Sequence, residues 1–223
     1  GHGKTNLNKA LQQSCNIYFY NLIQMVDFEL WSSEVKKFGF GDITKIDLNG
    51  EKKGIVPDRS YMNERYKDKG GWSTGHLLNL SIGQGEIMVT PIQIANLMNI
   101  IQNEGYSIQP HLNKSYAYSK NIIDYDKKVW KIIKQSMYDA VNKDKGTAYK
   151  ANLNMKGAKV YGKTGTAQIC SDCDLLPHAW FAGFLEFKNK KYSISVIIEN
   201  GGKGSDLPSE MSRKIFKYLV DNN

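Results

Sequence analysis

The sequence has no long hydrophobic run and only three cysteines among its 223 residues. No stretch approaches the roughly 20 apolar residues that a helix needs to cross a bilayer, and no signal peptide opens the chain. Three cysteines cannot make the disulfide framework of a small secreted domain. These absences exclude a membrane-spanning bundle and a disulfide scaffold, and we expect any membrane anchor to lie outside this sequence.

Acidic residues are also scarce relative to basic ones, since 22 Asp and Glu stand against 30 Lys and Arg, for a net charge of +8. A basic surface suits anionic partners such as lipid headgroups or wall polymers. No basic cluster is interleaved with stacking aromatic residues, so we expect no nucleic-acid partner. A lysine-rich solvated surface is the simpler interpretation, on a chain long enough for one globular domain.

Helical periodicity dominates the first two thirds of the chain. The spacing of apolar residues predicts one helix over residues 6–23 and another over residues 29–38. Thr90 followed by Pro91 predicts a further helix start, because a hydroxyl cap and a proline suit the first turn. Residues 50–75 hold many turn formers and charges, and we expect a long loop there.

Strand-like periodicity follows Gly157. It predicts strands over residues 159–166, 179–186 and 192–199, the last two joined near Asn189. A closing helix is expected over residues 208–220, with its apolar face towards the sheet (Met211, Ile215, Phe216 and Leu219). Helices followed by an antiparallel sheet and a closing helix predict an α+β fold in a single domain.

A Lys163-Thr164-Gly165-Thr166 motif stands at the end of the first predicted strand. Gly165 allows a substrate to approach the backbone, while the Lys163 charge and the threonine hydroxyls could hold a carboxylate. The backbone N–H of Thr166 could contribute to an oxyanion hole. Four residues alone are a weak motif, and a turn without function explains them equally well.

A second motif, Ser14-Cys15-Asn16, lies within the first predicted helix. Ser-x-x-Lys, Ser-Asp-Asn and Lys-Thr-Gly together form the acyl-transfer set of penicillin-binding proteins and β-lactamases, and Ser-x-Asn is a looser form of the second element. The Ser14 hydroxyl could relay a proton, and the Asn16 amide could bind a peptide backbone. The motif gains weight only because it precedes Lys-Thr-Gly by a long interval.

The segments around both motifs resemble, in order and over nearly the whole chain, the transpeptidase domain of class B penicillin-binding proteins, in particular the penicillin-binding protein 2 type. These segments are residues 1–4, 10–20, 38–41, 46–48, 80–86, 89–93, 146–148, 161–168, 180–184 and 199–202. The resemblance implies a penicillin-binding/β-lactamase-like fold, of which this chain is expected to hold the C-terminal portion.

The resemblance also implies that the nucleophile lies outside this chain. In the family, the acylated serine belongs to a Ser-x-x-Lys element upstream of Ser-x-Asn, and this chain starts only 13 residues before Ser14. Ser33-Glu34-Val35-Lys36 fits the pattern but follows Ser-x-Asn, so its order is wrong. We interpret it as a chance match, and we expect the chain alone to be inactive.

The implied activity is that of a serine-type D,D-transpeptidase, which needs no metal or organic cofactor. The absent serine would attack a terminal D-Ala-D-Ala bond, and an amine of a neighbouring stem peptide would then take the acyl group. In that scheme Ser14 helps to move the proton and Asn16 holds the substrate amide. Lys163, Thr164 and Thr166 hold the terminal carboxylate, or that of a β-lactam.

The resemblance further implies partners and a location. The partners would be peptidoglycan stem peptides or their lipid-linked precursor, β-lactams, a membrane glycosyltransferase and proteins of the elongation complex. The domain would stand on the periplasmic side of the bacterial inner membrane. A non-catalytic β-lactam sensor and a serine β-lactamase-like protein are alternative functions, although the flanking segments resemble wall synthases and no water-activating base can be placed.

Two features stay open at this point. Cys170 and Cys173 form a CxxC that could be half a zinc site, a disulfide or two free thiols. Trp72 lies in a glycine-rich stretch, and we expect it to line the substrate groove.

Overall fold

The computed structural model describes residues 2–115, 118–170 and 174–223. No helix within these ranges is long and apolar enough to cross a membrane. The elements follow in the order α1 (Leu7–Gln12), α2 (Asn16–Ile23), α3 (Phe28–Lys37), α4 (Arg59–Tyr66), η1 (Lys67–Lys69), α5 (Thr74–Ser81), α6 (Pro91–Gln102), β1 (Tyr106–Ile108), β2 (Lys120–Ile122), α7 (Lys127–Asn142), η2 (Tyr149–Ala151), β3 (Ala158–Ala167), β4 (His178–Phe187), β5 (Lys190–Ile198) and α8 (Leu207–Asp221).

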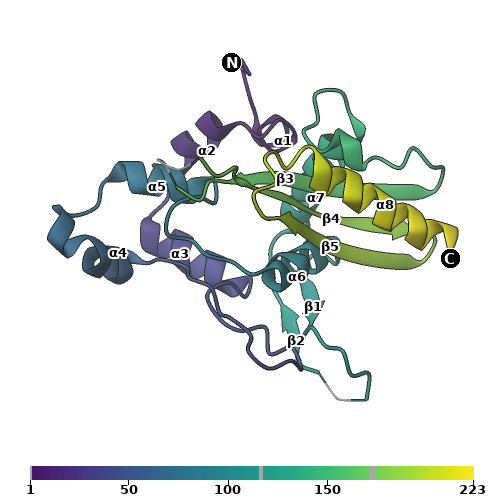
Figure 1. Cartoon of the computed structure of the whole chain (residues 1–223), viewed down its shortest axis with the longest axis horizontal. Coiled ribbons are helices and arrows are strands. Elements are labelled where there is room, and N and C mark those ends of the chain that lie inside the picture. Colours follow the sequence, from purple (N-terminus) through teal and green to yellow (C-terminus); the bar gives the residue numbers. More distant parts are fainter. Residues whose placement is uncertain (1, 116–117, 171–173) are drawn as a thin grey trace.

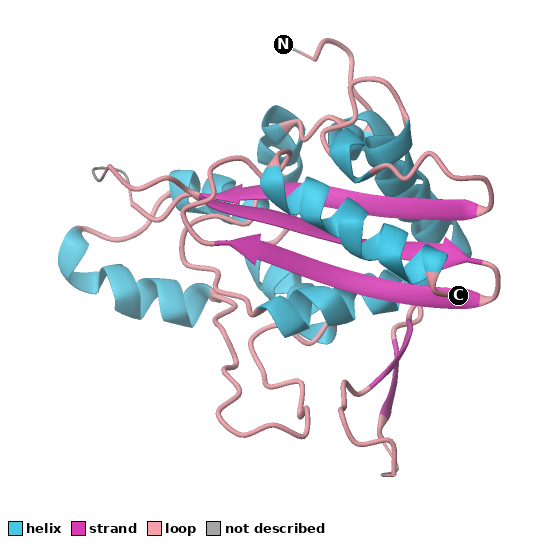
Figure 2. Cartoon of the chain, turned by 45° about the vertical axis from the view of Figure 1, so that its right-hand side comes forward, coloured by secondary structure: helices cyan, strands magenta, loops and turns pink. Residues whose placement is uncertain are grey.

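The strands β3, β4 and β5 form an antiparallel sheet in chain order (Figure 2). The register pairs Lys163 with Ala182, and Ala182 with Ser195. In the part of the chain that the structure describes, β4 is therefore central, and β3, which carries the Lys-Thr-Gly motif, is an edge strand. The α+β prediction is confirmed, and the three predicted strands agree with the observed bounds to within two residues.

Helices cover both faces of this sheet (Figure 1). Alternate residues of β4 point to opposite faces, so Phe181 joins a cluster with Phe216 of α8, whereas Phe184 joins a cluster with Met98 of α6. Fully burying one such phenylalanine contributes about 1.5–3 kcal/mol relative to leaving it exposed. The two clusters hold the sheet between α8 and α6, while α7 packs along β3.

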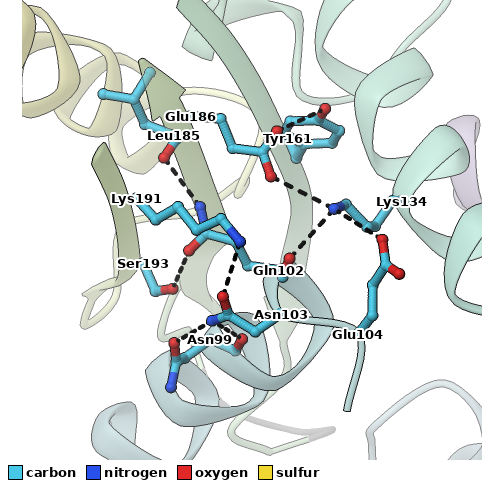
Figure 3. A network of polar contacts seen from close by, with 10 residues as sticks. All are labelled: Asn99, Gln102, Asn103, Glu104, Lys134, Tyr161, Leu185, Glu186, Lys191 and Ser193. Carbon is cyan, nitrogen blue, oxygen red and sulfur yellow. Dashed lines mark hydrogen bonds and ion pairs between the residues drawn. The ribbon is translucent and has the colours of Figure 1, made fainter. Parts of the chain in front are cut away.

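A polar network ties α6 and α7 to the sheet (Figure 3). The buried Gln102 side chain donates to the Leu185 carbonyl at 3.0 Å and accepts from the Ser193 hydroxyl at 3.2 Å. Lys134 donates to the Gln102 carbonyl at 3.2 Å and pairs with Glu186 at 3.4 Å. Because the buried amide is satisfied by both β4 and β5, the network fixes the position of α6 against the sheet.

Two predictions about the N-terminal half are wrong. Residues 6–23 form two helices rather than one, because Ser14 adopts a left-handed backbone with φ of 50°. The predicted loop over residues 50–75 contains α4 and η1. Asp58 caps α4 by accepting a bond from the Tyr61 N–H at 2.9 Å, and Met62 is buried in a cluster with Phe28.

The predicted apolar face of α8 is partly wrong as well. Phe216 is buried, but Met211 and Ile215 are each 41% exposed. Ser212 is buried in their place, and its hydroxyl donates to the Pro208 carbonyl at 2.8 Å. The short antiparallel pair β1–β2 was not predicted from the sequence.

Candidate active site

Ser14 lies in the turn between α1 and α2, and contacts with α7 and the segment after it hold α1 in place. Asn8 of α1 donates to the carboxylate of the buried Asp139 at 3.2 Å. The Gln12 carbonyl accepts from the Thr147 N–H, also at 3.2 Å. A left-handed backbone at a non-glycine residue costs roughly 1–3 kcal/mol and persists only where its surroundings enforce it. The anchored α1 supplies that support.

The strand β3 brings Lys163 against this turn. Its Nζ donates to Ser14 Oγ, and also to the Thr164 carbonyl at 2.8 Å. Burial removes water from the ammonium and lowers the pKa of Lys163 to about 8. Among the described residues, no carboxylate forms an ion pair with it. A desolvated cation without a counter-ion, next to a hydroxyl, favours an anionic ligand.

Threonine hydroxyls line the same end of β3. The Thr164 hydroxyl donates to the Thr147 hydroxyl at 3.1 Å. The Thr166 hydroxyl oxygen accepts from the Gly204 N–H at 3.3 Å. Because this bond uses only a lone pair, Thr166 keeps its own proton for donation to a carboxylate.

The segment before α8 passes directly over β3 at Gly204. A Cβ atom on Gly204 would lie 2.1 Å from the Gly165 carbonyl oxygen and 2.4 Å from that of Trp180. The buried Ser209 hydroxyl donates to the Gly204 carbonyl at 2.8 Å. Only glycine allows the backbone at position 204 to lie this close to β3. This close contact positions the Gly204 N–H that donates to the Thr166 hydroxyl.

The free edge of β3 faces away from β4. The Val160 carbonyl accepts from Asn142 Nδ2 at 2.9 Å, and the Thr166 carbonyl accepts from Gln84 Nε2 at 2.8 Å. In a strand, the N–H and C=O of one residue point to the same side. The Thr166 N–H therefore points to the open edge as well, which is the orientation that an oxyanion-hole donor needs.

Asn16 is exposed at the start of α2. With Ser14 it borders a pocket of about 620 Å³, and Lys163 is not among the residues that line it. The lining residues are His2, Gly3, Thr5, Ser14, Cys15, Asn16, Ile17, Tyr18 and Asn21. The two residues of the Ser-x-Asn motif thus share one pocket, and Ser14 links it to the Lys-Thr-Gly strand.

Trp72 lies in a separate cluster with Phe28 and Met62. Its ring centroid is 5.5 Å from that of Phe28, and its indole N–H donates to Asn63 at 2.7 Å. Within the described ranges, no contact joins Trp72 to Ser14 or to the Lys-Thr-Gly strand. Its place in a substrate groove stays a prediction.

The Ser33–Lys36 pattern shows no relay geometry. The Ser33 hydroxyl donates to the Leu30 carbonyl at 2.9 Å, within its own helix. The Lys36 ammonium pairs with Asp58 at 3.0 Å, so it is neutralised away from the serine. Both groups are engaged elsewhere, which supports the interpretation of a chance match.

The CxxC motif is only partly described. Cys170 is disulfide-bonded, whereas Cys173 lies outside the described residues. Over the ranges that the structure covers, no three His, Cys, Asp or Glu side chains gather in a way that could hold a metal ion.

Comparison with known proteins places this arrangement in a family. The model of the penicillin-binding protein transpeptidase domain matches residues 1–221. The chain belongs to this family. It is 34% identical to the peptidoglycan D,D-transpeptidase MrdA of Haemophilus influenzae, over 99% of this chain and 37% of the relative. The resemblance seen in the sequence is thereby confirmed.

Solved structures agree with the family and with the fold. PBP2 from Helicobacter pylori is 32% identical, with a TM-score of 0.84 over 98% of this chain and 41% of that one. PBP2 from Pseudomonas aeruginosa, in complex with WCK 5153, is 28% identical, with a TM-score of 0.84 over 96% of this chain and 49% of that one. The chain spans less than half the length of these relatives.

Three residues of this transpeptidase domain that touch the site were not singled out from the sequence. They are Gln84, Thr147 and Gly204. Gln84 and Thr147 lie within segments that carry the family resemblance, which was the one available signal. Their contacts with β3 span many residues of chain, so no local spacing could have indicated them.

Proposed function

We propose that the protein containing this chain is a peptidoglycan D,D-transpeptidase that cross-links stem peptides and is acylated by β-lactams. In this proposal the chain is the C-terminal portion of one transpeptidase domain. The observation that carries it is Lys163, a desolvated cation that binds Ser14 and stands beside two threonine hydroxyls. The site thus combines a carboxylate anchor with a hydroxyl that can relay a proton.

The reaction would begin with a serine outside this chain, in a Ser-x-x-Lys element. Its oxygen attacks the carbonyl carbon of the acyl-D-Ala-D-Ala bond, and the resulting oxyanion accepts a hydrogen bond from the Thr166 N–H. The C–N bond then breaks, and the leaving amine takes up the proton that the serine hydroxyl gave up, relayed through Ser14. D-Alanine departs. The amine of a second stem peptide then attacks the acyl-enzyme carbonyl, the ester bond to the serine breaks, and the proton lost by the amine returns to the released serine.

The carboxylate-binding groups on β3 explain why the donor stem peptide should end in a free carboxylate. Lys163 and the hydroxyl of Thr166 would hold that group, and the bond about to break would then lie next to Ser14. Asn16 stands on the pocket side of Ser14, where its amide would hold the backbone of the donor peptide. Thr164 would support the anchor through its bond to Thr147.

Two solved complexes of relatives support our proposal for the partners. A solved complex of PBP2 and MreC from Helicobacter pylori matches 98% of this chain with a TM-score of 0.83. The structure of a peptidoglycan synthase complex that coordinates polymerization and crosslinking also matches 98% of this chain, with a TM-score of 0.84. We extend these relationships to the present protein, as a membrane-anchored enzyme on the periplasmic side that works with a glycosyltransferase and elongation proteins.

The test is release of D-alanine by the full-length protein that contains this chain. The donor is a stem peptide that ends in acyl-D-Ala-D-Ala, and the matched control donor has a terminal carboxamide in place of the carboxylate. We expect release of D-alanine and cross-linked product from the first donor only. A stable penicillin adduct without D-alanine release would indicate a sensor, and rapid turnover of that adduct would indicate a β-lactamase; either result contradicts the proposal.

A further inference from the structure

The side chain of Gln84 bonds to the backbone of β3 immediately after the Lys-Thr-Gly motif. Gln84 Nε2 donates to the Thr166 carbonyl at 2.8 Å, and Gln84 Oε1 accepts from the Gln168 N–H at 3.3 Å. One residue of a parallel neighbouring strand would make the same two bonds, to the C=O of one residue and the N–H of the next but one. The side-chain amide of Gln84 therefore imitates the backbone N–H and C=O of one residue in a strand beside β3.

Two other carbonyls along this edge have partners within the protein. The Val160 carbonyl accepts from Asn142 of α7, and the Thr164 carbonyl accepts from the Lys163 ammonium. An extended peptide that joins the edge near Thr166 would use the Thr166 N–H and carbonyl together, as in strand addition. The carbonyl is the group that Gln84 occupies.

The surroundings of Gln84 allow its side chain to move while its backbone stays in place. Gly83 and Gly85 flank it, with φ of 77° and 79°, and the Gln84 N–H donates to the Asn79 carbonyl at 3.0 Å. The amide reaches exposed backbone, so both of its bonds compete with water. Its side chain can swing away without unfolding the loop.

We propose that Gln84 is a placeholder for the backbone amide of an extended ligand, and that a ligand N–H displaces it from the Thr166 carbonyl. This inference rests on the proposed function, because the ligand is an acyl-D-Ala-D-Ala peptide or a β-lactam that imitates it. Ligands with an amide N–H at that position displace Gln84, and ligands without one leave it in place. Gln84 is thus a positioning residue that affects the two ligand types unequally.

The experiment compares two β-lactams on the full-length protein. Benzylpenicillin carries a side-chain amide, while penicillanic acid has the same ring system and carboxylate with hydrogen in place of that side chain. Residual labelling by a fluorescent penicillin reports the acylation rate constant for each ligand. Both rate constants are measured on the same preparation of each variant. A smaller fraction of folded protein would therefore affect both equally and leave their ratio unchanged.

In the Gln84→Ala variant, the acylation rate constant for benzylpenicillin, divided by that for penicillanic acid, is expected to rise about fivefold. The reason is that the ligand N–H no longer competes with the Gln84 amide for the Thr166 carbonyl. Gln168→Ala is the matched control, since it keeps the backbone N–H at the same position, and its ratio should equal that of the wild type. An unchanged or lower ratio in Gln84→Ala would overturn the inference and show that Gln84 only braces the strand. Absence of any labelling of the wild-type protein would overturn the proposed function, and this inference with it.

Discussion

The ammonium of Lys163 donates a hydrogen bond to the hydroxyl of Ser14, although the two residues are 149 positions apart. One lies on the edge strand of the sheet, and the other lies in a turn that breaks the expected first helix. The turn holds its left-handed backbone because α1 is bonded to Asp139 and Thr147. The bond thus joins the two halves of the chain at the point where the proposed chemistry occurs.

Removing the Ser14 hydroxyl should slow acylation while leaving the fold intact. In the full-length protein, Ser14→Ala is expected to lower the rate of labelling by fluorescent penicillin roughly 10²- to 10⁴-fold, because the proton relay is lost. Ser33→Ala is the matched control and should label at the wild-type rate, since its hydroxyl bonds only to its own helix. Equal labelling of both variants would contradict the role given to Ser14.

The lowered pKa of Lys163 predicts a pH dependence of stability. In the folded protein the ammonium loses its proton near pH 8, whereas in the unfolded chain it does so near 10.5. Between these values the unfolded state binds more protons, so folding becomes more favourable as the pH rises. The free energy of unfolding of the wild type, relative to Lys163→Met, should therefore increase across this window in urea titrations. A constant or decreasing difference would contradict the desolvated site.

The affinity for a carboxylate ligand should change with pH in the direction opposite to the stability. The affinity for a carboxylate ligand should fall as the pH rises above about 8, because the cation that holds it disappears. A guanidinium stays charged throughout this range, so Lys163→Arg should show no such fall even if its affinity is lower at pH 7. Acylation rates measured against pH with benzylpenicillin would test this, and parallel profiles for the two proteins would argue against it.

The sequence was most informative where one local rule decides the structure. The predicted strand over residues 159–166 lies within β3 (Ala158–Ala167), and Thr90 with Pro91 starts α6 as expected. The order of the motifs identified the family without any contact being known. Those features depend on neighbouring residues, so a sequence can show them.

The sequence failed where distant contacts override a local pattern. Nothing near Ser14 marks a break, because its strained backbone depends on α7. On α8 the buried face contains Ser209 and Ser212, whose hydroxyls bond to the carbonyls of Gly204 and Pro208. A search for an apolar stripe finds Phe216 but misses the two buried serines, and it includes Met211 and Ile215, which are each 41% exposed.

The approach of Gly204 to β3 predicts a cost for any side chain there. Gly204→Ala places a Cβ against two carbonyl oxygens, and overpacking of this kind costs typically about 1–3 kcal/mol. The segment would shift and release the Thr166 hydroxyl, so acylation should fall as well. Gly75→Ala is the control, because the exposed Gly75 lies in α5 with no backbone near its Cβ, and this change should be neutral or slightly stabilising. Equal stabilities of the two variants would count against the close approach.

The network around Gln102 should contribute to stability without affecting the chemistry. Gln102→Ala leaves the Leu185 carbonyl without this partner in a buried place, which costs about 1–3 kcal/mol. Gln24→Ala removes only an exposed side-chain bond from the residue after α2 to the Tyr20 carbonyl, and it should change little. Urea unfolding of both variants is the measurement. A Gln102 variant as stable as the wild type would show that the network does not hold α6 in place.

The most direct measurement is the position of the penicillin adduct on the full-length protein. After labelling and proteolysis, mass spectrometry should find the acyl group on the serine of a Ser-x-x-Lys element N-terminal to residue 1 of this chain. The amount of adduct formed in a short reaction should fall in the Ser14→Ala variant and stay unchanged in Ser33→Ala. An adduct on Ser33, or on any other serine within residues 1–223, would contradict the proposed transpeptidase mechanism.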